Sequence, residues 1–397
     1  MIGLSTNHAR TGRMFSRTDQ SIVGQWWWTV DRVLLSIMLA LAGIGIVMVV
    51  TGSPPVAERL GLDQYYFFKR HMVFLVPSLL AMIGLSMCSH RTIWRIASVI
   101  LAGSILCMAF VLVAGAEVKG AQRWIHLPFG SIQPSEFAKP AFAVVIAWFM
   151  ARQKDQPGFP GDRLAAGLYA LLISLLILQP DFGMSMLVTA IIVGQVFLAG
   201  LPLRLVVGLG GVAALGGVGA YFGLHHVRSR IDRFLNPETG DTYQIDLARQ
   251  AFQEGGAFGA GPGQGTVKLA IPDAHTDFVF SVAGEEMGLV LLLIIIGLFA
   301  WVILRGLNRV MDSDNMFVIL GTGGLLTMFG CQSLVHMGSN LALIPTKGMT
   351  LPFLSYGGSS LVAVGIGMGF LLALTRRQGR STIAKGGMAP KTQMNAS

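Results

Sequence analysis

Long apolar runs separated by short polar segments fill most of this chain of 397 residues. The first run covers residues 33–50, and its 18 uncharged residues are enough to cross most of a hydrocarbon core about 30 Å thick. Comparable runs recur along the chain, and each is typical of a membrane-spanning helix. We predict ten spans, over residues 30–51, 72–89, 93–115, 136–151, 164–179, 182–200, 203–224, 278–304, 316–338 and 358–375. The pattern therefore predicts an all-α polytopic membrane protein with about ten transmembrane helices and one long outer loop between spans 7 and 8.

The composition agrees with the pattern of runs. Hydrophobic residues make up 53% of the chain and charged residues 12%, about half the charged fraction of a soluble protein. This balance excludes a disordered chain and argues against an ordinary soluble enzyme. The net charge of +9 is explained by basic residues that flank spans on the cytoplasmic side, so nucleic-acid binding is the weaker interpretation. The three cysteines all lie in apolar runs, which indicates neither a disulfide framework nor a zinc site.

The positions of lysine and arginine predict how the spans are oriented. With the N-terminus inside, the inner segments carry 17 basic residues and the outer segments carry 12, five of them in one long loop that counts less. We therefore expect both termini in the cytoplasm. The expected organisation is a cytoplasmic tail (1–29), a ten-span membrane domain (30–377) that includes a large extracytoplasmic loop (225–277), and a disordered cytoplasmic tail (378–397). The predicted span 203–224 is rich in glycine, which favours close helix packing, with a functional hinge as the alternative.

The segment Pro272–Phe278 closes the long outer loop and carries ionisable side chains. Asp277 is expected near the first turn of a helix, where the helix dipole and free N–H groups stabilise a carboxylate. A helix cap is the simplest interpretation, and a general base on the outer face is the functional alternative. His275 precedes it, and Glu285 and Glu286 follow. Ionisable groups at a membrane edge are costly and usually mark a pathway or a site.

A second polar segment surrounds the start of the predicted fourth span. Ser135 could cap this span, and Glu136 and Lys139 are spaced i, i+3 so that they could pair on one helix face. The alternative is a contact to an anionic lipid headgroup, for which Arg123 would supply a planar bidentate fork. The residues themselves leave both interpretations open.

The third polar segment covers residues 344–360. Its two prolines and three glycines forbid a continuous helix, and irregular backbone at membrane depth persists only where it is buried in protein or lines a cavity. Ser355, Ser359 and Ser360 could form an anion-binding nest with the neighbouring glycine amides, and a plain re-entrant loop is the alternative. Three polar residues inside spans are expected to make interhelical hydrogen bonds rather than relay protons, namely Gln195, Gln332 and His336.

Taken together, these motifs resemble the SEDS family of bacterial cell-wall polymerases from about residue 30 to residue 377. The matching stretches are Arg123–Ile125, Gln133–Lys139, Gln179–Gly183, Arg230–Ile231, His275–Phe278, Gly284–Glu286 and Leu354–Ser360. The stretch Pro345–Gly348 is more similar to the cell-division member of the family than to the elongation member. One departure is that residues 267–271 lack the acidic residue that some members carry there, so any role of that acid does not transfer.

The resemblance implies a ten-span fold and a peptidoglycan glycosyltransferase that polymerises lipid II, a disaccharide-pentapeptide on undecaprenyl pyrophosphate. It places the protein in the bacterial cytoplasmic (inner) membrane at the division septum. The expected partners are a class B penicillin-binding protein, which is a single-span transpeptidase, and other membrane proteins of division. The essential outer-loop aspartate of the family maps onto Asp277.

The chemistry of such a reaction assigns roles to the candidate residues. A β-1,4 bond formed from an α-linked pyrophosphate inverts the anomeric centre, and Asp277 as general base would contribute about 10²–10⁴-fold. The departing pyrophosphate needs preorganised cations, for which Arg123, Lys139, Arg230 and Lys347 are the candidates. The expected substrate-binding residues are Arg123, Glu136, Lys139, Asp181, Arg230, His275, Glu286, Lys347, Ser355, Ser359 and Ser360. No cofactor is required by the ligand set, although a divalent cation (Mg²⁺ or Mn²⁺) could share the charge. The lipid tail is expected in a groove between spans.

Two other functions remain open at this stage, a lipid II flippase and a non-catalytic division scaffold. A flippase needs charges deep in several spans, whereas the charges of the predicted spans are sparse and cluster at their outer ends. Convergence of the ionisable residues on one outer cavity would favour the enzyme, and a continuous charged channel to the cytoplasmic face would favour transport. A scaffold predicts that Asp277→Asn leaves function intact.

Overall fold

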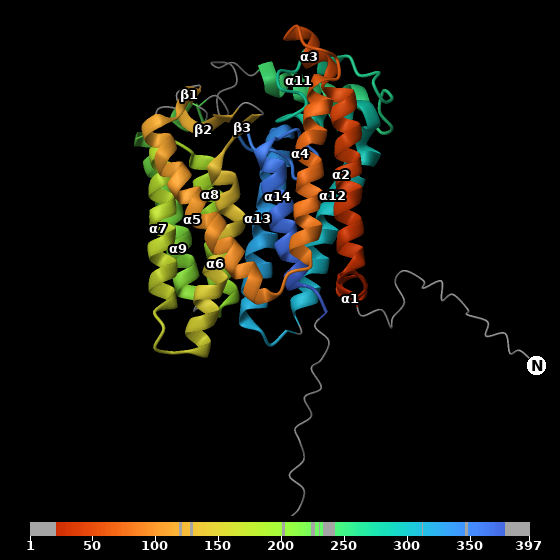
Figure 1. Ribbon diagram of the computed structural model, residues 1–397. Helices are drawn as coiled ribbons and strands as arrows, with labels where there is room; N and C mark the ends of the chain where they lie inside the picture. The colour runs from red at the N-terminus through yellow and green to blue at the C-terminus, as the bar shows by residue number, and fades with distance from the viewer. Residues whose placement is uncertain are drawn as a thin grey trace, which may run out of the picture.

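The long helices stand side by side in one bundle (Figure 1). The computed structural model describes residues 21–118, 121–127, 130–200, 203–223, 227–229, 231–232, 243–311, 313–345 and 348–377. Each predicted span corresponds to one long helix of the bundle, so the ten-helix prediction is confirmed for this part of the chain. These helices are α2 (Arg32–Gly52), α4 (Tyr66–Ser86), α5 (His90–Ala114), α6 (Pro134–Asp155), α7 (Gly161–Leu178), α8 (Phe182–Leu198), α9 (Leu203–Gly223), α12 (Val279–Val310), α13 (Met316–Asn340) and α14 (Ser359–Leu374).

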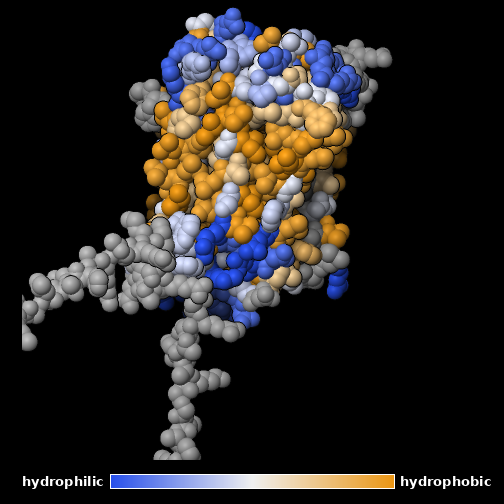
Figure 2. Space-filling view, turned by 90° about the vertical axis from the view of Figure 1, so that its right-hand side faces the viewer, coloured by the Kyte–Doolittle hydropathy of each residue, from blue (hydrophilic) through white to orange (hydrophobic). Residues whose placement is uncertain are grey.

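The composition of the helices fits a bilayer. Among the described residues, six helices are long and apolar enough to cross a membrane, namely α2, α4, α5, α7, α12 and α13, and two further apolar helices, α8 and α14, are shorter. Figure 2 shows an apolar band between two polar ends. This is the distribution expected of a protein that spans a bilayer several times, so the chain is a multi-pass membrane protein.

The two ends of the bundle differ. The described chain begins and finishes at one of them, where the backbone N–H of Arg377 donates to the carbonyl of Thr29 (3.0 Å). The short helix α1 (Ile22–Thr29) lies at this end, which we call the termini end. The opposite end, which we call the loop end, carries α3 (Pro54–Arg59), α11 (Tyr243–Gly255), the 3₁₀ turn η2 (Val267–Leu269) and a small sheet (Figure 1).

The sheet and α11 were not predicted from the sequence. Three antiparallel strands run in the order β1 (Ala116–Val118), β2 (Ala121–Leu127) and β3 (Gly130–Ile132). In the pairing of β2 with β3, Ile125 lies opposite Ile132. Strands this short do not produce the long alternation by which a strand is recognised. Their role is to carry the chain from α5 to α6 while it passes over the loop end.

The helices α6, α13 and α14 form the interior of the bundle, and most of their side chains are buried. Several polar groups in this interior form hydrogen bonds between helices. The Gln195 amide donates to the carbonyls of Ala143 (2.6 Å) and Leu320 (3.1 Å), so it connects α8 to both α6 and α13. The prediction that Gln195 forms interhelical hydrogen bonds is confirmed.

Three local predictions were wrong. Asp277 is not the cap of α12, because Phe278 holds that position. Ser135 is not the cap of α6, because the helix begins at Pro134 after Gln133, which makes no side-chain capping bond. Close packing does not explain the glycines of α9, since a Cβ would meet no atom within 4 Å at any of them: Gly208, Gly210, Gly211, Gly216, Gly217, Gly219 and Gly223.

Candidate active site

The segment that carries Asp277 is fixed at the loop end by the irregular chain before α14. The Ser355 hydroxyl donates to the carbonyl of Thr276 (2.8 Å), and the Tyr356 N–H donates to the carbonyl of His275 (2.9 Å). On the other side, the Asn340 amide of α13 donates to the carbonyl of Asp277 (2.8 Å). The backbone around Asp277 is therefore held by residues 63 to 81 positions away in the chain.

The carboxylate of Asp277 is half-buried and faces this irregular segment. Gly348 has a positive φ of 62°, and a Cβ built on it would lie 3.4 Å from Asp277 Oδ2. The backbone at Gly348 therefore lies directly beside the carboxylate, at a distance where a Cβ would be in van der Waals contact with it. His336 supports the same backbone from α13, because its Nδ1 donates to the carbonyl of Met349 (2.6 Å).

His275 is packed among aromatic rings two residues before Asp277. Its ring centroid lies 4.2 Å from that of Phe67 and 5.2 Å from that of Tyr356. Burial lowers the pKa of His275 to about 4, so the imidazole is neutral at neutral pH. In this state His275 packs as an aromatic residue and adds no positive charge beside the carboxylate.

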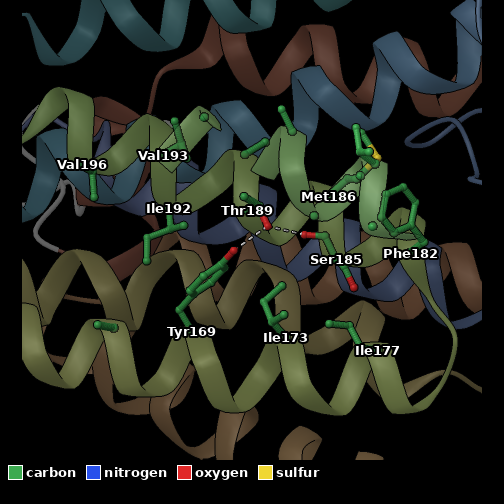
Figure 3. A pocket seen from close by; sticks show the side chains of 18 of the residues that line it. Tyr169, Ile173, Ile177, Phe182, Ser185, Met186, Thr189, Ile192, Val193 and Val196 are labelled. Atoms are coloured by element: carbon green, nitrogen blue, oxygen red, sulfur yellow. Dashed lines mark hydrogen bonds between the residues drawn. The ribbon is translucent and has the colours of Figure 1, made fainter. Parts of the chain in front are cut away.

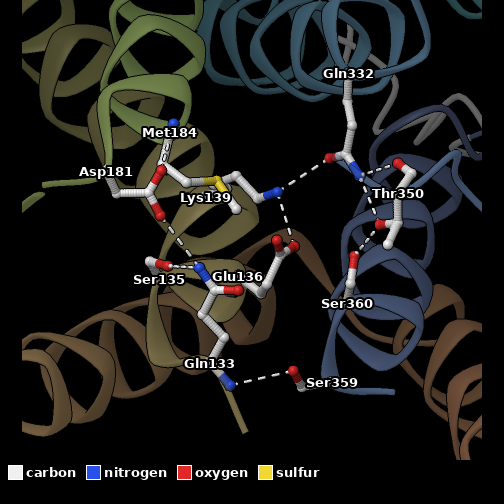
Figure 4. Close-up of polar contacts among 10 residues, drawn as sticks. All are labelled: Gln133, Ser135, Glu136, Lys139, Asp181, Met184, Gln332, Thr350, Ser359 and Ser360. Carbon is white, nitrogen blue, oxygen red and sulfur yellow. Dashed lines mark hydrogen bonds and ion pairs between the residues drawn. The ribbon is translucent and has the colours of Figure 1, made fainter. Parts of the chain in front are cut away.

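A second polar cluster surrounds the start of α6 (Figure 4). Lys139 lies 2.8 Å from Glu136 and donates to the Gln332 amide oxygen (3.0 Å). The Gln332 nitrogen donates to the carbonyl of Thr350 (2.9 Å), and the Thr350 hydroxyl contacts that of Ser360 (2.7 Å). The predicted i, i+3 pair is confirmed, and so is the interhelical role of Gln332.

Arg123 on β2 extends this cluster toward α8. Its guanidinium donates to the carbonyls of Gln179 (2.9 Å) and Pro180 and lies 3.7 Å from Asp181. Burial raises the pKa of Asp181 although Arg123 opposes the shift. Gln133 connects Asp181 to the start of α14, because its side-chain nitrogen donates to Asp181 (3.2 Å) and its backbone N–H donates to Ser359 Oγ (3.1 Å).

Glu285 and Glu286 bind the part of the outer loop around Val267 and Lys268. Glu285 accepts hydrogen bonds from the N–H groups of Val267 (2.6 Å) and Lys268 (2.9 Å). Glu286 forms a buried ion pair with the Lys268 ammonium, which also donates to the carbonyl of Thr51 (3.0 Å). Both carboxylates thus serve the fold of the segment that leads to Asp277.

The helix α12 is interrupted at Gly288, and the loop packs against this interruption. Gly288 has φ 72° and ψ −173°, which are not helical values. The chain at 256–261 supplies the missing partners: Ala260 N–H donates to Glu285 O (2.9 Å), and Leu289 N–H donates to Gly256 O (3.0 Å). The outer loop and the first turns of α12 therefore share one hydrogen-bond network.

An apolar groove opens between α7, α8 and α9 (Figure 3). Its volume is about 1430 Å³, and it runs from Asp162 near the termini end to Phe182 and Ile231 near the loop end. The Tyr169 hydroxyl contacts that of Thr189 (2.8 Å) within it. Because Phe182 directly follows Asp181, the groove begins beside the Arg123 cluster.

The structure brings most of the predicted site residues to the loop end. Arg123, Glu136, Lys139, Asp181, Ser359 and Ser360 share one network, and His275, Asp277 and Ser355 lie where residues 348–356 connect to it. Glu286 lies apart with Lys268. Arg230 and Lys347 fall outside the described residues. Within the described ranges, no group of three His, Cys, Asp or Glu side chains could hold a metal ion, and the expectation of a divalent cation stays a prediction.

Four polar residues of the site were not identified from the sequence as candidates, namely Gln133, Lys268, Asn340 and Thr350. Gln133 lies in a motif that was recognised, and its position next to Pro134 at a helix start was the available signal. Lys268, Asn340 and Thr350 bond to residues distant in the chain, so only the structure identifies them.

The ion pairs of the described residues lie toward the two ends of the bundle. Those near the loop end are Lys69–Asp63, Arg123–Asp181, Lys139–Glu136, Arg228–Asp232 and Lys268–Glu286, and those at the termini end join Arg305 and Arg309 to Asp31. Chemistry at one face is therefore favoured over a charged passage between the faces.

Comparisons with known proteins agree with this arrangement. A model of the FtsW, RodA and SpoVE family of cell cycle proteins matches residues 32–380. The chain is 43% identical over 365 residues to the probable peptidoglycan glycosyltransferase FtsW of Caulobacter vibrioides, covering 92% of this chain and 94% of that protein. It is 36% identical to the protein of the same name from Trichlorobacter lovleyi, covering 87% and 93% of the two chains.

Solved structures show the same fold. One belongs to a peptidoglycan synthase complex that coordinates polymerization and crosslinking, with a TM-score of 0.73 and 30% identity over 88% of this chain and 98% of that one. Another is the rod shape determining protein RodA of Thermus thermophilus, with a TM-score of 0.64 and 29% identity over 89% and 99% of the two chains. The chain belongs to the FtsW, RodA and SpoVE family, that is, to the SEDS proteins, and is FtsW-like within it.

Proposed function

We propose that this protein is a peptidoglycan glycosyltransferase that polymerises lipid II into β-1,4 glycan strands by an inverting mechanism. The observation that carries the proposal is the position of Asp277, a half-buried carboxylate on a fixed segment adjoining a cluster with two cations, Arg123 and Lys139. Its relatives in Caulobacter and Trichlorobacter bear the name of this activity.

Asp277 acts as the general base in this mechanism. The 4-hydroxyl of the acceptor sugar is too weak an acid to ionise in advance, so the carboxylate takes its proton as the new bond forms. The bond between the anomeric carbon of the growing strand and its pyrophosphate breaks at the same time. Asn340 and Ser355 fix the backbone carbonyls of Asp277 and Thr276, so the segment that carries the base needs little reorganisation during the reaction, which is the condition for efficient catalysis.

The departing pyrophosphate is stabilised by the cluster around α6. Arg123 is the more accessible of its two cations, with 27% of the side chain exposed against 2% for Lys139, so we assign the direct contact to Arg123. The buried Lys139 contributes its positive charge without direct contact, and Glu136 and Gln332 fix the position of its ammonium group. Ser359 and Ser360 add hydroxyl groups at the start of α14. Arg230 and Lys347 keep their predicted role as further cations on the sequence argument alone.

The groove between α7, α8 and α9 receives the undecaprenyl tail. A polyprenyl chain that stays in an apolar environment avoids the cost of exposing its surface to water. The end of the groove at Phe182 adjoins Asp181 and Arg123, so a lipid in the groove presents its pyrophosphate to the cluster.

The finer assignments are part of the same proposal. We place the protein in the bacterial cytoplasmic membrane at the division septum, with both termini in the cytoplasm and the loop end outside. A class B penicillin-binding protein is its transpeptidase partner. The similarity to a chain of a complex that couples polymerization to crosslinking supports such a partner.

The test is strand synthesis from labelled lipid II by the protein purified with its transpeptidase, whose own site is blocked. We expect long strands from the wild type and none from Asp277→Asn. Asp273→Asn is the matched control, because Asp273 is an exposed aspartate of the same loop whose positive φ of 53° an asparagine tolerates. Strands from Asp277→Asn would remove Asp277 from catalysis. A folded wild-type complex without any strands would favour a flippase or a scaffold, and a liposome flipping assay separates these two.

A further inference from the structure

Two tryptophans from neighbouring helices stack near the termini end, away from the site described above. Trp94 of α5 and Trp148 of α6 have ring centroids 4.4 Å apart and planes inclined by 15°. α5 begins at His90 and α6 ends at Asp155, so at about 1.5 Å per residue both rings lie within roughly 10 Å of their helix ends. This is the depth at which indole rings prefer to lie in a membrane interface.

Exposed arginines surround this stack. The Arg95 guanidinium carbon lies 5.6 Å from the Trp94 ring centroid, and that of Arg152 lies 5.5 Å from the Trp148 centroid. Arg91 precedes Arg95 by one helical turn and is also exposed. The ion pairs of the described residues involve other arginines, and at the same end Asp31 neutralises Arg305 and Arg309. Arg91, Arg95 and Arg152 thus form no salt bridge among the described residues, and with Asp155 one turn after Arg152 the cluster keeps a net positive charge.

This arrangement suits a phosphate group. A guanidinium that lies against a ring is held extended, and its planar fork of N–H donors matches the oxygens of a phosphate. Because the aromatic rings restrain the arginines beforehand, less conformational freedom is lost when an anion binds. Basic pockets between transmembrane helices on the cytoplasmic side are a recognised mode of binding anionic headgroups.

The apolar surface next to the arginines identifies the rest of the ligand. Val99, Leu106 and Phe110 follow Arg95 on one face of α5 at four, eleven and fifteen residues, and their side chains are 73%, 71% and 58% exposed. The stripe lies in the hydrocarbon region and the arginines at its edge, so a lipid, whose phosphate and acyl chains are covalently joined, contacts both at once, whereas an acidic peptide at the interface contacts the arginines alone.

We propose that Arg91, Arg95 and Arg152, together with the stacked Trp94 and Trp148, form a binding site for an anionic phospholipid of the cytoplasmic leaflet. The headgroup phosphate binds the arginines, and an acyl chain lies along α5. The site is separate from the polymerisation chemistry, and its test does not depend on that chemistry.

The test is native mass spectrometry of the purified full chain, incubated with equal amounts of phosphatidylglycerol and phosphatidylcholine. We expect the wild type to retain phosphatidylglycerol preferentially. Each arginine that contacts the headgroup phosphate contributes about fivefold, so R95A/R152A should retain roughly 25-fold less phosphatidylglycerol. The matched control is R163A/R204A, which removes the same charge from exposed arginines at the starts of α7 and α9, and we expect it to behave as the wild type.

The outcomes that overturn the proposal are distinct. Equal retention of the two lipids by the wild type would exclude a site for anionic lipid, and this measurement needs no variant. Equal losses in R95A/R152A and in the control would show that only net charge matters. If R95A/R152A does not fold, R95K/R152K keeps the charge but lacks the planar fork, and undiminished retention by that variant would contradict the role of the guanidinium groups.

Discussion

The ion pair between Lys268 and Glu286 yields the sharpest prediction for stability. Their side chains are 4% and 0% exposed, and the second carboxylate oxygen of Glu286 has no hydrogen-bond partner among the described groups. An exposed pair contributes only about 0.2–1 kcal/mol, but removal of one partner from a buried pair costs about 3–5 kcal/mol because it leaves an uncompensated buried charge. We therefore expect Lys268→Met to lower the free energy of unfolding by about 3–5 kcal/mol.

The double variant distinguishes this reasoning from a general effect of mutation. Lys268→Met with Glu286→Leu replaces both charges by apolar groups of similar volume, so we expect it to recover most of the loss. The assay is unfolding of the full chain in mild detergent by titration with SDS. Lys69→Met is the matched control, because Lys69 pairs with Asp63 at 2.5 Å with both side chains more than half exposed, and its loss should stay below about 1 kcal/mol. A double variant that is no more stable than Lys268→Met alone would refute the argument.

Three further predictions address the site and the packing. Arg123→Lys keeps the charge but not the planar fork, so kcat/KM for lipid II should fall at least about tenfold, and a strand-synthesis assay with varied lipid II measures it. The pKa of His275 is depressed to about 4, so the unfolded chain binds more protons between pH 4 and 6.5 and stability falls as the pH drops through this window; His275→Phe should flatten that slope in thermal unfolding scans at stepped pH. Gly255→Ala places a Cβ against the carbonyl of Gly284 and should cost about 1–3 kcal/mol, whereas Gly217→Ala on α9 meets no atom and should cost nothing in the same SDS titration.

The spans could be predicted from the sequence because their signal is local. A run of apolar residues long enough to cross a bilayer is typical of a transmembrane helix and rare in soluble domains, and the ten runs correspond to the ten long helices. The helix α11 was not predicted, because its 13 residues are rich in polar side chains and contain no long apolar run. The glycines of α9 led to an incorrect expectation, since composition shows that close packing is possible but not that a neighbouring helix approaches the glycine positions.

The site was accessible from the sequence only in part. Glu136 and Lys139 could be paired from their spacing, because one helical turn brings them together. The contacts around Asp277 could not, since Asn340 of α13 bonds the Asp277 carbonyl and Ser355 of the segment before α14 bonds the Thr276 carbonyl, both across a large sequence separation. The ionisable cluster at 285–286 was recognised as unusual, but its partner Lys268 has a buried position that hydropathy alone does not indicate.

The interruption of α12 at Gly288 has a consequence for biogenesis. The 22 residues that follow it, about 33 Å at 1.5 Å per residue, suffice to cross the hydrocarbon core, so the interruption falls at the edge of the bilayer. Unpaired peptide groups there would be costly, and the N–H and carbonyl groups of residues 256–261 satisfy them. The peptide groups of α12 beside Gly288 are therefore satisfied only when residues 256–261 pack against the helix. Stable integration of α12 and folding of the loop that precedes Asp277 therefore depend on each other.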